Sequence, residues 1–175
     1  MTDREYTEYV SQRLERLRRV AYLLCRDWHR ADDLVQMTVT KLYVNWRRAS
    51  AADDMDRYVH RILVNCFLSE GRKWWSRVAL VAQPPEEAAP ATDAATTLAV
   101  RELLALVPPR QRATLVLRFY CDLTTEQTAE VLGCSDGTVK SQTAKGLARL
   151  RELWTGRAGP PGRLTSGAGR TTPKK

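Results

Sequence analysis

Two pairs of adjacent carboxylates come closest, by residue type, to a metal or acid–base site. Asp32-Asp33 and Asp53-Asp54 offer the oxygen ligands that divalent cations prefer. Both pairs are expected at helix starts, where carboxylates oppose the positive end of the helix dipole. Neither pair has a matching His or Glu at a spacing that would complete a ligand cage or a catalytic pair. We therefore expect no metal, no cofactor and no enzymatic reaction; a metal-dependent nuclease is the enzyme alternative.

The histidines and cysteines form no further reactive group. His29 is expected in a polar turn and His60 on an exposed helix face, because neither has a nucleophile or ligand at a suitable spacing. No Cys-x-x-Cys pair occurs, so neither a zinc site nor a redox motif is indicated. We interpret the cysteines as reduced and mostly buried; they are Cys25, Cys66, Cys121 and Cys134.

Cations and aromatic rings alternate in the segment Arg72-Lys73-Trp74-Trp75-Ser76-Arg77. Bases exposed by strand opening can stack on such rings, each stack being worth ~1–3 kcal/mol. The neighbouring cations can contact phosphates. Tryptophan is also a common core anchor. Both interpretations of Trp74 and Trp75, base platform and core residue, therefore stay open.

The segment from Thr124 to Leu153 predicts two helices joined by a tight turn. Thr124 and Gln127 have the capping-box spacing, so a helix is expected to start at about Thr125. Gly133 suits the positive φ of a helix C-terminus, and Ser135 is a good N-cap for the next helix. This pattern is typical of a helix-turn-helix.

The second of these helices has an outer face that suits the major groove of DNA. One face is formed by Val139, Thr143, Gly146, Leu147, Leu150 and Leu153. The opposite face is small, polar and basic, as close approach to base edges and phosphates requires. An ordinary helical hairpin with a solvated charged face is the alternative, but acids are nearly absent from the outward arc after Asp136.

Composition favours a polyanionic partner. The chain of 175 residues carries a formal net charge of +8, and basic surface neutralises phosphates and releases their counterions. No stretch reaches the ~18 consecutive apolar residues of a membrane helix, and the polar N-terminus does not resemble a signal peptide. We expect a cytoplasmic protein.

Helical periodicity organises residues 1–77 into a bundle without a credible strand. Apolar residues recur every three or four positions in three segments. The first carries Tyr6, Val10, Leu14, Leu17, Ala21 and Leu24; the second Ala31, Leu34, Val35, Thr38, Leu42 and Trp46; the third Met55, Tyr58, Val59, Ile62, Leu63, Cys66 and Phe67. The fold class is therefore all-α.

A break in composition divides the chain into two small helical domains. Residues 78–97 are acidic and rich in Ala, Pro and Thr, which predicts a flexible linker. Beyond it, Val100 to Val107 predict a short helix ended by Pro108-Pro109, and Pro109 can open the next helix. That helix carries Ala113, Val116, Leu117, Phe119 and Tyr120. The second domain spans 98–155, and the basic tail 156–175 should be disordered.

Taken together, these segments resemble a sigma factor of the extracytoplasmic-function (ECF) class, which has only domains two and four of the sigma-70 superfamily. Ala31-Asp32-Asp33-Leu34-Val35-Gln36 resembles the family segment that docks on core RNA polymerase. Tyr58 to Asn65 resembles the segment that opens and reads the minus-ten element. Leu132 to Ser135 with Gly137 to Ser141 resembles the minus-thirty-five unit. Gln142 stands where arginine often follows in the family.

The resemblance implies three sets of contact residues. The polymerase-binding set is Asp32, Asp33, Leu34 and Gln36. The minus-ten set is Arg61, Asn65, Arg72, Lys73, Trp74, Trp75 and Arg77. The minus-thirty-five set is Gly137, Thr138, Lys140, Ser141, Gln142, Ala144, Lys145 and Arg149. The implied partners are core polymerase, promoter DNA and, as in other members of this class, an anti-sigma factor.

Two functions remain as hypotheses. As a sigma factor, the chain would direct polymerase to promoters and assist their opening, by binding and not by catalysis. As a stand-alone helix-turn-helix regulator, it would bind a half-site palindrome as a dimer. The second hypothesis gives Ala31 to Gln36 no role, and the sequence has no dimerisation heptad.

Overall fold

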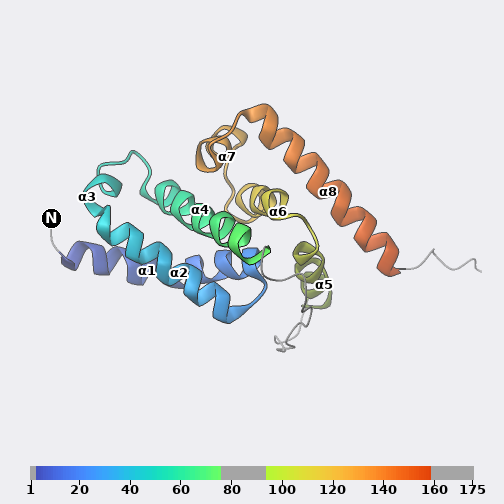
Figure 1. Cartoon of the computed structure of the whole chain (residues 1–175), viewed down its shortest axis with the longest axis horizontal. Helices are drawn as coiled ribbons and strands as arrows, with labels where there is room; N and C mark the ends of the chain where they lie inside the picture. Colours follow the sequence, from blue (N-terminus) through green and yellow to red (C-terminus); the bar gives the residue numbers. More distant parts are fainter. Residues whose placement is uncertain (1–2, 76–93, 159–175) are drawn as a thin grey trace, which may run out of the picture.

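The computed structural model describes residues 3–75 and 94–158, and these residues are helical without a strand (Figure 1). The elements are α1 (Asp3–Cys25), α2 (Trp28–Val44), α3 (Trp46–Ala49), α4 (Met55–Trp75), α5 (Ala94–Ala105), α6 (Pro109–Leu115), the π-helical turn η1 (Val116–Tyr120), α7 (Thr125–Leu132) and α8 (Asp136–Ala158). The all-α prediction is confirmed.

Helices α1, α2 and α4 form the first bundle, with short α3 at its end (Figure 1). Their predicted apolar faces are buried; Val20, Leu24, Leu42 and Leu63 lie in the core with 0% exposure. Leu14 is the exception at 44% exposed, because α1 meets its neighbours mainly through its C-terminal half. Its expected core position is therefore wrong.

The turn between α1 and α2 differs from the sequence prediction. Arg26 has a φ of +61°, which closes α1, and the Asp27 side chain accepts a hydrogen bond from the Arg30 amide as the N-cap of α2. Asp32 and Asp33 therefore lie in the second turn and not at the helix start. His29 was expected in a polar turn between helices. It is exposed, but it belongs to the first turn of α2. Asp54 does cap α4 through the Arg57 amide.

The second group comprises α5, α6, η1, α7 and α8. Pro109 opens α6 as predicted, after α5 has ended at Ala105. Of the apolar residues predicted on this helix, Ala113, Val116 and Leu117 are buried, whereas Phe119 and Tyr120 are 62% and 41% exposed. The π-helical turn η1 holds one more residue than a turn of α-helix. The residues after it therefore point in directions that regular helical spacing does not predict.

Two helices extend beyond the limits predicted for the linker and the tail. Helix α5 begins at Ala94, inside the predicted linker, and α8 continues to Ala158, past the predicted start of the tail at Gly156. Residues 76–93 and 159–175, which hold the rest of the predicted linker and tail, lie outside the described residues. The four cysteines form no disulfide; Cys66 and Cys121 are buried, and Cys25 and Cys134 are half-buried.

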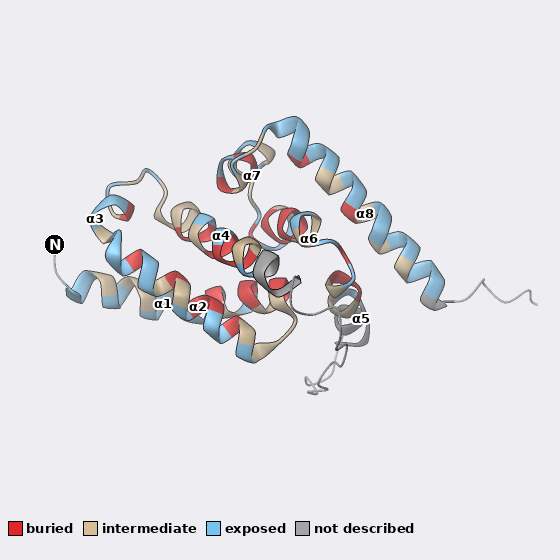
Figure 2. Cartoon of the chain, in the orientation of Figure 1, coloured by how far each residue is buried: buried red, intermediate tan, exposed pale blue. Residues whose placement is uncertain are grey.

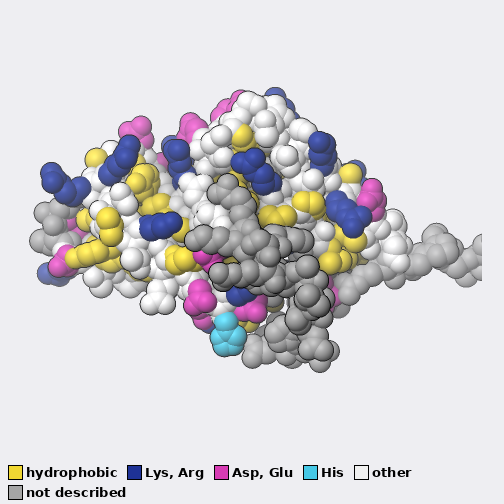
Figure 3. All heavy atoms as spheres, in the orientation of Figure 1, with side chains coloured by type: hydrophobic (Ala, Val, Ile, Leu, Met, Phe, Trp, Pro, Cys, Tyr) yellow, Lys and Arg dark blue, Asp and Glu magenta, His cyan; other side chains and the backbone are white. Residues whose placement is uncertain are grey.

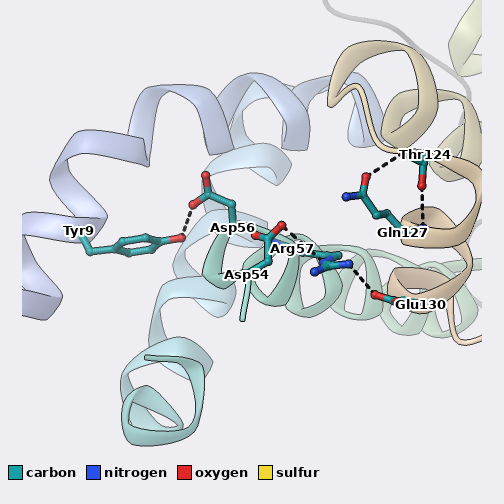
Figure 4. Close-up of polar contacts among 7 residues, drawn as sticks. All are labelled: Tyr9, Asp54, Asp56, Arg57, Thr124, Gln127 and Glu130. Atoms are coloured by element: carbon teal, nitrogen blue, oxygen red, sulfur yellow. Dashed lines mark hydrogen bonds and ion pairs between the residues drawn. The ribbon is translucent and has the colours of Figure 1, made fainter. Parts of the chain in front are cut away.

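His60 is buried at 6% exposure, so the prediction of an exposed helix face is wrong. It lines a small hollow between α1 and α4 together with Tyr9, Arg13 and Asp56. Burial, followed by the neighbouring Arg16, lowers the pKa of His60. Burial alone would raise the pKa of Asp56, but hydrogen bonds from Tyr9 (2.6 Å; Figure 4) and Arg13 (2.5 Å) outweigh it and lower that pKa.

The two groups of helices share one continuous core (Figure 2). Arg112 of α6 reaches across it: Nη1 donates to the Leu24 carbonyl at 2.6 Å, and Nη2 donates to the carbonyls of Ala105 and Val107. Carbonyls at helix C-termini lack intrahelical partners and carry the negative end of the dipole. One guanidinium thus completes the ends of α1 and α5, and burial lowers its pKa to about 10.

We expect Arg112→Met to lower the free energy of unfolding by about 2–3 kcal/mol, because the carbonyls it leaves behind lose their donors in a partly buried site. Arg110→Met is the matched control, since Arg110 is exposed on the same helix. Urea unfolding followed by circular dichroism measures both. Equal stability of the two variants would contradict a capping role for Arg112.

Candidate nucleic-acid interface

The helix-turn-helix forms as the sequence predicts. Thr124 caps α7: its Oγ1 accepts from the Gln127 amide at 3.2 Å, while the Thr124 amide donates to Gln127 Oε1 at 2.9 Å (Figure 4). Gly133 has a φ of +62°, where a side chain would be strained. Ser135 Oγ accepts from the Thr138 amide at 3.2 Å and so caps α8. The predicted capping box, left-handed glycine and N-cap are confirmed.

The first turns of α8 bury one face against α6. Val139 is fully buried, and the Thr143 hydroxyl donates to the Val139 carbonyl. Gly146 is buried where α8 meets α6; a Cβ there would lie 2.9 Å from Leu115 Cδ1 and 3.1 Å from Leu115 Cγ. The absence of a side chain at Gly146 therefore sets how closely α8 approaches α6.

The opposite face of α8 is exposed (Figure 2). Its exposed members are Gly137, Thr138, Lys140, Ser141, Ala144, Lys145 and Arg149, and Gln142 is half-buried. All eight predicted minus-thirty-five residues thus lie on one helix, and seven of them are fully on its outer side. Figure 3 shows Lys and Arg side chains over this part of the molecule.

Two acids approach this basic face. Glu152 forms an ion pair with Arg149 at 3.2 Å. The pKa of Glu126 is lowered by hydrogen bonds from its own amide and from Thr124, and further by Lys140. Sequence spacing within α8 could not place Glu126 near Lys140, because the two residues belong to different helices. Arg149 is therefore paired within its own helix, whereas Lys140 and Lys145 form no ion pair with another described residue and are the cations of this face on which phosphate binding would rest.

The first bundle presents a second, acidic face on α2. Asp32, Asp33 and Gln36 are exposed, whereas Leu34 is 2% exposed and so packs in the core instead of offering a contact. Arg18 binds Asp32 through two hydrogen bonds of 2.5 and 3.0 Å, which lower the pKa of that carboxyl. Arg18 was not found from the sequence, because it lies 14 residues away on α1.

Arg18 is itself held by a stack of aromatic rings. Its guanidinium lies 5.0 Å from the Trp28 ring centroid, and Trp28 stacks on Tyr22 at 4.0 Å. A cation over an aromatic ring gains electrostatic attraction and loses freedom of movement. The stack therefore fixes the Asp32 carboxylate at the α1–α2 face.

The minus-ten set divides into a described and an undescribed part. Arg61 and Asn65 are exposed and lie one turn apart on α4, so they share a face. The backbone of Arg72, Lys73, Trp74 and Trp75 forms the end of α4, but their side chains, and all of Arg77, lie outside the described residues. The two interpretations of Trp74 and Trp75 stay open.

Helix α7 lies against the N-terminal part of α4 (Figures 1 and 4). Arg57 Nη1 contacts Glu130 Oε2 at 2.8 Å, and Arg57 Nε lies 3.5 Å from Asp54 Oδ2. A hollow of about 170 Å³ at this junction is lined by Ala52, Asp53, Asp54, Arg57, Tyr58, Arg61, Glu130 and Val131. The helix-turn-helix therefore touches the helix that carries Arg61.

Within the described ranges, no group of three or more His, Cys, Asp or Glu side chains is placed to hold a metal ion. The same part of the chain has no helix that is long and apolar enough to cross a membrane.

The sequence matches two family profiles: residues 9–77 match "Sigma-70 region 2" and residues 97–150 match "Sigma-70, region 4". The chain is 36% identical over 154 residues to the RNA polymerase sigma-E factor of Streptomyces coelicolor, with 85% of each chain covered. It is 31% identical over 141 residues to the ECF RNA polymerase sigma factor SigM of Mycobacterium tuberculosis, with 78% of this chain and 70% of the relative covered.

Solved structures share the fold. The sigma factor RpoE of Bartonella quintana, in complex with the anti-sigma factor NepR, superposes with a TM-score of 0.72 at 25% identity; 86% of this chain and 97% of that chain are covered. CnrH, in complex with the cytosolic domain of CnrY, gives a TM-score of 0.61 at 20% identity, with 89% and 90% covered.

Substitution of two glycines in α8 tests how the helix is seated. Ala is normally favoured over Gly inside a helix, so Gly156→Ala, which meets nothing within 4 Å, should raise the free energy of unfolding by roughly 0.5 kcal/mol. Gly146→Ala should instead lower it by about 1–3 kcal/mol, because the methyl group overlaps Leu115. Thermal unfolding of both variants measures the difference. A stabilised Gly146→Ala protein would show that α8 is not closely seated on α6.

Proposed function

This chain belongs to the sigma-70 family, in its extracytoplasmic-function class, and we propose that it binds core RNA polymerase and places it on a specific set of promoters. The proposed action is binding alone, in the cytoplasm, with the polymerase performing the chemistry. The observation that carries it is the exposed outer face of α8, which is small, polar and basic at the positions that the family resemblance assigns to DNA.

Promoter recognition would use the two groups of helices separately. We call them the first module (α1 to α4) and the second module (α5 to α8). The proposed minus-thirty-five contact is the outer face of α8, where Lys140 and Lys145 are exposed and short side chains allow close approach to the groove. The proposed minus-ten contact is the face of α4 with Arg61 and Asn65, followed by the segment Arg72 to Arg77. The domain limits 1–77, 78–97, 98–155 and 156–175 are proposed as the corresponding units.

Polymerase docking would use α2. Asp32, Asp33 and Gln36 form an exposed face of the kind a basic partner surface would bind, and buried Leu34 keeps that face oriented. The Arg18–Asp32 pair leaves Asp33 as the carboxylate for which no ion pair is found in the described residues. We propose Asp33 as the principal charged contact and Asp32 as a contact positioned by Arg18. An anti-sigma factor is proposed as a further partner, as in the RpoE complex.

The test is reconstitution with core polymerase and a library of genomic promoters, scored for transcripts and for co-purification. We expect transcripts from a subset of promoters with the native chain. Asp33→Arg should lose co-purification, because it reverses a charge on the docking face, whereas Glu8→Arg on exposed α1 should retain it. No transcript and no co-purification with the native chain would rule out the proposed function.

The contact between α8 and duplex DNA has a separate signature in salt dependence. Each lost phosphate contact should reduce the slope of log affinity against log salt by about 0.9. We expect this change for Lys140→Ala and for Lys145→Ala in binding to a minus-thirty-five duplex from a recovered promoter, and no change for Lys41→Ala on α2. Unchanged slopes for both α8 variants would place the DNA-binding face elsewhere.

A further inference from the structure

The contact between α7 and α4 engages one cationic side chain, Arg57, that the proposed function does not use. Arg57 lies one helical turn before Arg61 on α4, so both side chains leave the same face of the helix. Both line the hollow whose other side is formed by Glu130 and Val131 of α7. Arg57 is thus part of the same surface as the proposed minus-ten contact.

Arg57 is held by two carboxylates. Asp54 is the N-cap of the same helix, and its Oδ2 lies 3.5 Å from Arg57 Nε. Glu130 belongs to the other module, and its Oε2 lies 2.8 Å from Arg57 Nη1. The side chain of Arg57 is 25% exposed and that of Glu130 is 64% exposed, so the pair lies at the rim of the contact. A guanidinium donates to a carboxylate or to a phosphate through the same fork of N–H groups. Glu130 therefore occupies a position that a phosphate oxygen could take.

We propose that Arg57 is a further phosphate-binding residue for the minus-ten strand, and that Glu130 takes the place of that phosphate when the two modules are packed together. This inference rests on the proposed function for the identity of the strand. The partner that the Arg57 surface fits is single-stranded nucleic acid, and the α7 surface is its competitor within the same chain.

The spacing of the promoter elements requires that Glu130 leaves Arg57 when the chain binds a promoter. The two promoter elements are centred roughly 25 base pairs apart, which is roughly 85 Å along the DNA at 3.4 Å per base pair. Helices in contact have axes about 8–10 Å apart, so α4 and the α7–α8 unit present their faces within roughly 20–30 Å. A chain packed in this way cannot contact both elements. Helix α7 must leave α4 on the promoter, and this movement frees Arg57.

The Arg57–Glu130 ion pair is weak enough to be replaced by a phosphate. An ion pair at a solvent-exposed rim contributes little to stability, because water and salt screen it. It can therefore be replaced by a phosphate without loss of a strong interaction. Arg57 remains oriented after the exchange, because Asp54 belongs to the same module and stays with it.

Binding of a short fluorescein-labelled single strand of random sequence to the full-length chain tests the proposal, since a phosphate contact does not depend on the base. Glu130→Gln should raise affinity about threefold, as expected for the loss of one competing surface ion pair. Glu126→Gln, the same charge change on the same helix but without contact to Arg57, is the matched control and should give a smaller gain. Arg57→Gln should lower affinity and reduce the salt slope by about 0.7.

The double variant and the polymerase complex complete the test. Glu130→Gln should give no gain in an Arg57→Gln background, because the two residues act through one contact. With core polymerase bound, Glu130→Gln should have no effect and Arg57→Gln should still weaken binding. Equal gains from Glu130→Gln and Glu126→Gln, or an unchanged salt slope for Arg57→Gln, would overturn the proposal. The free-chain measurements need no polymerase, so failed co-purification would count against the proposed function and not against this inference.

Discussion

The packing of the two described groups of helices depends on the partly buried guanidinium of Arg112. It sits on α6 and donates hydrogen bonds to carbonyls at the ends of α1 and α5, where the helical backbone has acceptors but no donors of its own. Two of its partner residues, Ala105 and Val107, belong to its own module, and the third, Leu24, belongs to the other. The charge therefore keeps partners when the modules separate, while it favours their contact when they do not.

Residues close together in the chain explain most of what the sequence could predict. The capping box of Thr124 and Gln127, the left-handed Gly133 and the start of α6 at Pro109 depend on neighbours within a few positions, and all three are confirmed. The periodicity of the three bundle helices was predicted for the same reason. The exposed face of α8 followed from spacing and its assignment to DNA from the small, polar and basic residues on it, whereas its minus-thirty-five role came from the family resemblance.

The errors arose where distant contacts decide the outcome. His60 has no apolar character, yet the packing of α1 on α4 buries it beside Tyr9 and Asp56. Phe119 and Tyr120 are exposed at the end of a π-helical turn, which helical spacing in the sequence did not predict. Arg18 on Asp32 and Glu130 on Arg57 join residues 14 and 73 positions apart, which no local pattern encodes. These long-range pairs are also the ones that orient or cover the proposed binding surfaces.

Replacement of Glu130 by a strand phosphate at Arg57 requires that the modules are packed in the free chain and separated on promoter-bound polymerase. The most direct test is the distance between spin labels at Gln12 on α1 and Ala148 on α8, both exposed positions, introduced as non-natural amino acids so that the cysteines remain. For the free chain we expect one narrow distribution set by the packed helices, and for the promoter complex a distance longer by several tens of ångströms, because the two promoter elements lie roughly 85 Å apart. The same distance in both states would contradict it.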